Sequence, residues 1–147
     1  METASEVLPV YQAGKYLTFR VARQDFAMSA DCVRGILPMH EMVALEKPHH
    51  WICGFAAVAG RDFPVLDLTA KLAIPRGPPG REPFVIVVET TGRLAGFVAD
   101  RVSELLDLRV HDFRNGVVRG RGRPRRVLDP DQIMTAEDWT ACELSLR

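Results

Sequence analysis

The sequence has few cysteines, and they form no recognisable motif. Cys32, Cys53 and Cys142 are odd in number and have no C-x-x-C spacing. A disulfide scaffold or a zinc finger needs paired or clustered cysteines, so the sequence argues against both classes. We therefore expect reduced thiols that act as small buried hydrophobic side chains, in a protein of the cytoplasm.

Long hydrophobic runs are also missing. The longest runs, such as Phe84 to Val88, are far shorter than the roughly 20 residues that a membrane-spanning helix needs. Residues 1–14 contain two Glu and no basic residue, unlike a signal peptide. We expect this segment to be a flexible N-terminal tail on a soluble protein.

The chain has no net charge, but its charges are unevenly placed. Its 19 basic and 19 acidic residues cancel, so no global field draws it toward nucleic acid or membrane. Residues 109–126, however, hold seven Arg against the single Asp112, which gives this segment a charge of +6 and the remainder −6.

Groups that could carry catalysis or bind a metal are sparse. His49 and His50 are adjacent, so on a strand they point to opposite faces, and no Cys or carboxylate stands at a zinc-binding spacing. Cys53 has no neighbouring base to activate it. Glu41 and Asp62 could belong to an acid/base pair, but a sequence does not fix the separation that such a pair needs. We predict no metal, no cofactor and no enzymatic activity.

The most regular pattern in the chain spans residues 54–68. It predicts two strands joined by a tight turn at residues 60–62, where Gly60 can adopt a positive φ. Apolar and β-branched residues flank the turn, as is typical of a half-buried sheet. Asp67 is expected to cap a short helix that follows.

Both halves of the chain show the same order of hairpin, short helix and further strands. In the second half, Phe84 to Val88 is expected to form a strand and Thr91-Gly92 the turn that follows it. Ser29 and Asp100 are expected to cap short helices, the second with Val102, Leu105 and Leu106 on one face. Thr135 is expected to cap a final helix. The pattern favours two small β-barrels, about 15–74 and about 84–134, joined by a proline-rich connector at 75–83 and followed by a C-terminal helix or tail at 135–147. The predicted core includes Phe19, Val58, Val65, Val85, Val87 and Phe97.

Two motifs resemble the CheW-like domain family. The segment from Gly54 to Asp67 is similar to the family's motif of a Gly, an apolar pair, Asn-Leu-Arg-Gly, three apolar residues, Pro, two apolar residues and Asp. The segment from Ala95 to Leu105 is similar to its Gly-apolar-apolar-x-Asp-x-Val-x-Glu-apolar signature, and the resemblance covers about residues 16–134. It implies a mostly β fold of two packed, five-stranded, SH3-like barrels with short helices.

The resemblance also implies a function. Members of the family are non-catalytic adaptors in chemotaxis-type signal transduction, which bridge the regulatory domain of a CheA-like sensory histidine kinase and the cytoplasmic tip of methyl-accepting chemoreceptors. Such a protein would be cytoplasmic and recruited to receptor arrays at the membrane. The residues expected by resemblance to bind the receptor are Val33, Gly54, Asp100, Val102 and Leu105.

The chain departs from the family at Ala57, where the family usually has Asn, and at two positions that the family pairs with each other. Gly35 and Ala59 stand where the family usually has Glu and Arg, which are expected to face each other as an ion pair near the receptor-binding surface. Losing both partners of such a pair can be nearly neutral, whereas losing one costs about 3–5 kcal/mol. The fold is therefore expected to survive the double loss.

The arginine-rich segment 119–126 supports an alternative function. Arg121-Gly122-Arg123-Pro124 resembles the core of an AT-hook, in which arginines enter the narrow minor groove of A·T-rich DNA. A single basic loop reaches few phosphates, so the affinity would be low. The alternative to the adaptor is thus a nucleic-acid-associated regulator that uses Arg121 and Arg123. If these arginines have no such function, we expect them to lie in an exposed hairpin loop of the second barrel.

Overall fold

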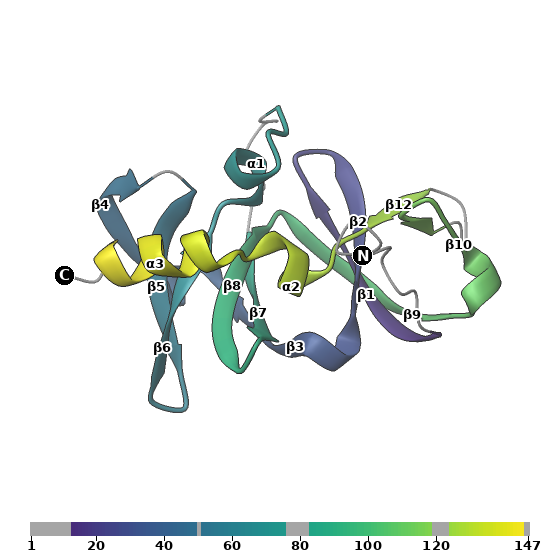
Figure 1. Cartoon of the computed structure of the whole chain (residues 1–147), viewed down its shortest axis with the longest axis horizontal. Coiled ribbons are helices and arrows are strands. Elements are labelled where there is room, and N and C mark those ends of the chain that lie inside the picture. Colours follow the sequence, from purple (N-terminus) through teal and green to yellow (C-terminus); the bar gives the residue numbers. More distant parts are fainter. Residues whose placement is uncertain (1–12, 50, 76–82, 119–123, 146–147) are drawn as a thin grey trace, which may run out of the picture.

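The computed structural model describes residues 13–49, 51–75, 83–118 and 124–145, which form two six-stranded β-sheets with short helices (Figure 1). The first sheet has the order β10-β11-β12-β2-β1-β9 and consists of β1 (Gly14–Val21), β2 (Gln24–Ser29), β9 (Arg101–Leu108), β10 (Phe113–Arg114), β11 (Val117–Val118) and β12 (Arg125–Val127). The second has the order β3-β7-β8-β6-β5-β4 and consists of β3 (Val33–Pro38), β4 (Val43–His49), β5 (Ile52–Val58), β6 (Arg61–Leu66), β7 (Phe84–Thr90) and β8 (Arg93–Ala99).

The helices are short. In the described part of the chain, three of them are 3₁₀ turns and three are α-helices: η2 (Ala30–Cys32), η3 (Met39–Glu41), η4 (Val110–Asp112), α1 (Leu68–Lys71), α2 (Pro130–Ile133) and α3 (Ala136–Ser145). Asp67 caps α1 by accepting a hydrogen bond from the Thr69 N–H, as predicted. The expected helix after Ser29 is only the single turn η2, because the chain enters β3 at Val33.

Each sheet combines strands from both halves of the chain. The strands β7 and β8, which follow the connector, join the second sheet, where β3 pairs with β7 and β6 runs parallel to β8. The strands β9 and β12 return to pair with β1 and β2. The mostly β fold of two sheets with short helices is as predicted. The strands are exchanged between the two halves of the chain, because a local pattern predicts a hairpin but does not specify the distant strand with which that hairpin pairs. Residues 1–12 of the expected tail and 76–82 of the connector lie outside the described residues.

Two-residue turns with positive φ close the hairpins. The predicted turn at Thr91 and Gly92 is confirmed, with φ values of 51° and 78°. The turn of the central hairpin lies at Ala59 and Gly60, with φ values of 52° and 78°, one residue earlier than predicted. Arg61 already pairs with Val58 in the ladder, so the predicted turn residues 61–62 belong to β6. Such turns match the twist of the flanking strands.

The main core fills the space between the sheets. Leu17 and Phe19 of β1 meet Ile86 and Val88 of β7 there, together with Phe97 of β8. Of the core residues predicted from the sequence, five are buried and Val58 is half-buried. This cluster, called here the inter-sheet core, holds the two sheets together.

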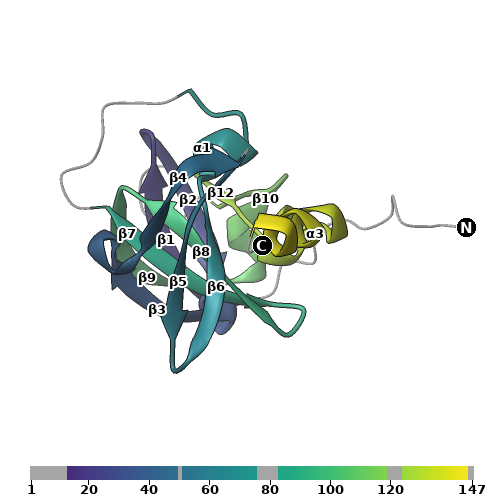
Figure 2. The ribbon, with the colours of Figure 1, turned by 90° about the vertical axis from the view of Figure 1, so that its left-hand side faces the viewer.

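The C-terminal helix α3 lies outside the sheets, along one side of the molecule (Figure 2). Thr135 begins it as predicted: the Asp138 N–H donates to the Thr135 hydroxyl, and the Thr135 N–H donates to the Asp138 carboxylate. Trp139 and Cys142 turn inward and join the inter-sheet core. The side chain of Lys71 on α1 donates to Asp138 over 2.6 Å, which fastens the two helices together.

Candidate protein-binding surface on strands β3 and β9

Residues 101–108 form strand β9, so the prediction of a helix beginning at Asp100 is wrong. The spacing of the apolar residues at 102, 105 and 106 also fits one face of a helix. Pairing with β1 overrides that local pattern, because the ladder satisfies the backbone hydrogen bonds of β9 and buries Leu106 in a second cluster with Tyr16.

A β-bulge in β9 brings Val102 and Leu105 to the same face of the first sheet. Val102 pairs with Phe19 and Leu105 with Leu17, with a register shift between the two pairs. Directly paired residues point to one face of a sheet, and Leu17 and Phe19 both point into the inter-sheet core. Val102 packs against that core, whereas 58% of Leu105 is exposed.

The hydroxyl of Thr18 holds this bulge. It donates to the Glu104 carbonyl and accepts from the Glu104 N–H, with both donor–acceptor distances 3.0 Å. Thr18 is only 1% exposed. A single buried side chain therefore satisfies the backbone groups that the bulge takes out of the β1–β9 ladder.

Strand β3 repeats this arrangement on the second sheet. Val33 pairs with Val88 and Ile36 with Ile86, again with a register shift between them. Val88 and Ile86 both belong to the inter-sheet core. Val33 packs against that core and Ile36 is 41% exposed. In a regular strand, residues three apart such as Val33 and Ile36 lie on opposite faces. The bulge puts both on the same face, which an alternating sequence pattern does not predict.

The edge strands β3 and β9 thus extend the inter-sheet core to the surface. Each is the terminal strand of its sheet, so each has one side without a partner strand in the described part of the chain. We call Val33, Ile36, Val102 and Leu105 the apolar strip. Exposed apolar side chains that continue a core are typical of sites where another protein binds.

Asp100 has a structural position beside this strip. It lies between β8 and β9, where its carboxylate accepts a 2.7 Å hydrogen bond from the Ala22 N–H. Its own N–H donates to the Arg20 carbonyl over 2.8 Å. Asp100 therefore fixes the β8–β9 corner onto the β1–β2 turn, where Ala22 has a φ of 49°.

Gly54 is buried in β5 and allows a close approach by β4. A Cβ atom added there would lie 2.4 Å from the Val43 carbonyl oxygen and 2.9 Å from the Met42 sulfur. Because the carbonyl oxygen is part of the β4 backbone, it cannot turn aside as a flexible side chain can. Any residue larger than glycine at position 54 would therefore push β4 away from β5.

The two positions of the family's expected ion pair lie on different parts of the second sheet. Gly35 is in β3, paired with Val87, and a Cβ added to it would meet nothing within 4 Å. Ala59 is the first residue of the β5–β6 turn. Strands β7, β8 and β6 separate β3 from β5 in the order of the sheet.

The described residues contain no group of three or more His, Cys, Asp and Glu side chains able to hold a metal ion. A cleft of about 460 Å³ lies beside η2 and α2, and Cys32 lines it. Burial, with the charge of Asp129 second, raises the pKa of the Cys32 thiol to about 11. Burial and the charge of Asp138 do the same for Cys142. Both thiols are therefore protonated near neutral pH and poor nucleophiles.

The arginine-rich segment is only partly described. Arg121 and Arg123 lie outside the described residues, so the candidate nucleic-acid contact is not placed. Arg125 and Arg126 belong to β12, where Arg126 is exposed and pairs with Val117 of β11.

The sequence matches the family described as CheW-like domain over residues 15–138. The chain belongs to the CheW-like domain family. The match includes both strands of the apolar strip and ends within α3. The family resemblance predicted from the two motifs is therefore confirmed.

Known CheW proteins are similar to this chain along nearly its whole length. The chemotaxis protein CheW of Rhizobium meliloti is 23% identical over 139 residues, which are 85% of this chain and 90% of that protein. The chemotaxis protein CheW of Thermotoga maritima is 25% identical over 146 residues, 91% of this chain and 94% of that protein. The crystal structure of the scaffolding protein TtCheW from Thermoanaerobacter tengcongensis has a TM-score of 0.74, with 16% identity, 93% of this chain covered and 96% of that chain.

As a CheW-like protein, the chain is an adaptor of chemotaxis signal transduction. Its two-sheet fold is that of a CheW scaffolding protein. The relatives named above give no support to the nucleic-acid-associated alternative. In the described residues, no helix is long and apolar enough to cross a membrane.

Proposed function

We propose that this chain bridges the regulatory domain of a CheA-like histidine kinase and the cytoplasmic tip of a chemoreceptor, and that the apolar strip contacts the receptor. One observation carries the proposal: bulges in two edge strands place Val33, Ile36, Val102 and Leu105 on the faces that share the inter-sheet core. Three of these positions, other than Ile36, are those that the family resemblance assigns to receptor binding.

The proposed mechanism needs no chemical step. An adaptor that binds two partners passes on a coupling free energy, typically about 1–3 kcal/mol, between the two binding events. The raised pKa values of Cys32 and Cys142 agree with a non-catalytic role. Gly54 and Asp100 contribute by positioning β4 and β9, since each serves a packing or backbone contact inside the fold.

The proposal is tested by measuring binding to each partner separately. Titration calorimetry of the purified chain with a receptor-tip fragment and with the kinase regulatory domain gives the two affinities. Leu105→Ser removes an exposed apolar anchor, and we expect it to weaken receptor binding by about tenfold, which corresponds to about 1.4 kcal/mol. Affinity for the kinase domain is expected to stay the same.

Val110→Ser is the matched control. Val110 is 62% exposed, like Leu105, but lies on η4 outside the strip. It should leave receptor binding unchanged. Equal losses from the two variants, or native receptor affinity in Leu105→Ser, would refute the strip as the receptor contact.

The family resemblance predicts that Gly35 and Ala59 stand at the two ends of a lost ion pair. The described sheet argues against direct contact between them, because three strands lie between β3 and β5. Urea unfolding of Gly35→Glu, Ala59→Arg and the double variant forms a double-mutant cycle, and we expect the two effects to add to within about 0.5 kcal/mol. A favourable coupling above about 1 kcal/mol would show that the two side chains meet.

A further inference from the structure

We propose that β10, β11 and β12 form a docking site for an acidic segment of a partner protein, with Arg114 and Arg126 on either side of Val117 as its contact residues. This site is separate from the apolar strip, and it does not depend on which partners the adaptor bridges. We call it the arginine row.

The register of three strands builds the arginine row. Arg114 pairs with Val117 in the β10–β11 ladder, and Val117 pairs with Arg126 in the β11–β12 ladder. Paired residues share a face, so the three side chains form one line across the sheet. Neighbouring strands are about 4.8 Å apart, which puts the two arginine backbones about 10 Å from each other.

The opposite face of these strands is the core face. Phe113 and Val118 pair with each other and are buried in the cluster that contains Tyr16. That burial fixes the orientation of the small sheet. Arg114 and Arg126 lie on the other face, which on β12 adjoins the buried Phe26 of β2. Both arginines are exposed, while Val117 between them is half-buried.

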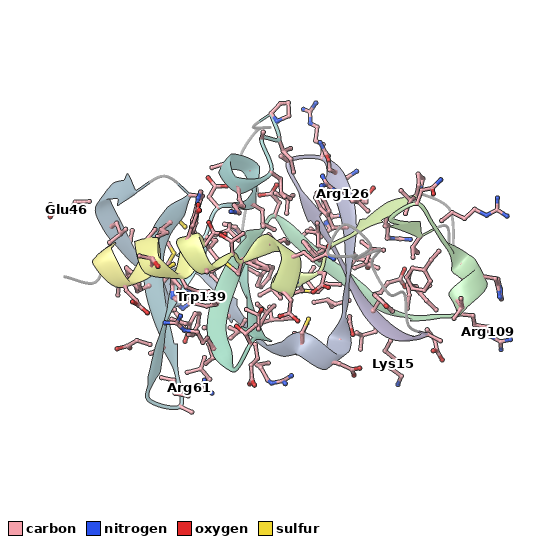
Figure 3. All side chains as sticks on the ribbon, in the orientation of Figure 1. Lys15, Glu46, Arg61, Arg109, Arg126 and Trp139 are labelled. Atoms are coloured by element: carbon pink, nitrogen blue, oxygen red, sulfur yellow. The ribbon has the colours of Figure 1, made fainter. Side chains whose placement is uncertain are left out.

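The positive charge of the row is not neutralised within the described part of the chain. No ion pair there joins Arg114 or Arg126 to a carboxylate. The one acid of the segment, Asp112, accepts a 2.7 Å hydrogen bond from the Arg109 N–H and lies 3.6 Å from His111. In Figure 3, Arg109 and Arg126 lie on the half of the molecule that holds the first sheet, away from Glu46.

The chemistry of the row favours a protein over a nucleic acid. A guanidinium binds a carboxylate through two parallel hydrogen bonds, and two such groups around an apolar residue match a segment with acids flanking an apolar side chain. Nonspecific affinity for nucleic acid instead rises with the number of phosphates neutralised. Two cations separated by a valine neutralise few phosphates and leave the valine without an apolar partner.

The test uses the full-length chain and two labelled peptides, one with leucine between paired glutamates and one with serine in its place. Fluorescence anisotropy at about 50 mM and about 150 mM NaCl gives the affinities. We expect the leucine peptide to bind more tightly than the serine peptide, and both to weaken with salt. The double variant Arg114→Gln/Arg126→Gln should weaken binding of the leucine peptide at least tenfold.

Arg23→Gln/Arg61→Gln is the matched control, since it removes two exposed arginines, one from the β1–β2 turn and one from β6, that lie outside both the arginine row and the apolar strip. It should change the affinity by less than twofold, and receptor and kinase binding should be unaltered in both double variants. Equal losses in the two double variants would show a general charge effect and overturn the proposal. Tighter binding to a 20-base-pair duplex, or to vesicles with phosphatidylserine, would overturn it in favour of a nucleic acid or a membrane.

Discussion

Single buried groups decide the geometry of the proposed receptor contact. Thr18 is the clearest case, because its hydroxyl bonds both backbone groups of Glu104 at the bulge in β9. Without that bulge, Val102 and Leu105 would lie on opposite faces of the strand. The apolar strip on β9 thus depends on a side chain that lies beneath it and has no access to a partner.

Thr18→Val should therefore destabilise the protein. It keeps the size of the side chain but leaves the N–H and C=O of Glu104 unpaired beside a buried residue, at a cost of about 1–3 kcal/mol. Urea unfolding measures the change. Thr18→Ser keeps the hydroxyl and should lose less; a valine variant as stable as the native protein would mean that the hydroxyl does not hold the bulge.

Gly54→Ala should also destabilise the protein, through overpacking. The new methyl group would meet the Val43 carbonyl oxygen at 2.4 Å, so β4 would have to move away from β5, at a cost of about 1–3 kcal/mol. The control is Gly35→Ala, where the methyl group enters open space. Equal unfolding midpoints for the two variants would contradict this assignment.

At the scale of secondary-structure elements, α3 is attached by a buried carboxylate. Burial of Asp138 raises its pKa, but hydrogen bonds from Lys71 and Thr135 outweigh this effect and leave the pKa below its usual value. The Lys71 ammonium also lies 4.9 Å from the centre of the Trp51 ring. The charged form of Asp138 thus stabilises the contact between α1 and α3.

The contribution of Asp138 should depend on pH. Because its pKa is lower in the folded than in the unfolded protein, its stabilisation is present above the unfolded pKa of about 4 and is lost as the pH falls through the folded value. Asp138→Asn should lower the free energy of unfolding by about 1–3 kcal/mol at pH 7. The difference from the native protein should shrink below about pH 4.

Glu143→Gln is the control for Asp138→Asn. Glu143 pairs with Arg93 over 2.8 Å, but its side chain is 57% exposed, so the change should stay within about 0.5 kcal/mol. Urea unfolding at pH 7 and near pH 3 distinguishes the two. A constant deficit for Asp138→Asn at both pH values would show that its charge does not stabilise α3.

At the scale of the whole molecule, exchange of strands between the two halves should make unfolding a single event. Neither sheet can form from one half alone, since β1 and β2 pair with β9 and β12 while β3 and β6 pair with β7 and β8. The inter-sheet core then joins both sheets. We expect one cooperative transition, seen identically by far-UV circular dichroism and tryptophan fluorescence.

Core truncations in the two sheets test this cooperativity. Val65→Ala in the second sheet and Val118→Ala in the first each remove a side chain with 0% exposure, and each should lower stability by about 1–3 kcal/mol. Both should move the same transition to lower urea. Two separate transitions, with each variant shifting only one, would show that the sheets are independent domains.

The sequence by itself determined the features that depend on neighbouring residues. Gly92 marked a two-residue turn, Asp67 and Thr135 marked helix starts, and apolar runs marked buried strands such as β7. The two motifs identified the family and therefore its fold. These signals are local, because a cap or a tight turn is completed within three or four residues of chain.

Only the tertiary structure decided which strands pair and where they bulge. The spacing of Val102, Leu105 and Leu106 fits a helix as well as a bulged strand, and pairing with β1 selected the strand. The register between β3 and β7 places Ile36 beside Val33 at the surface. The register between β11 and β12 places Arg126 in line with Arg114. The physical reason is that a ladder joins residues far apart in the chain, so its register depends on partners that the local sequence does not specify.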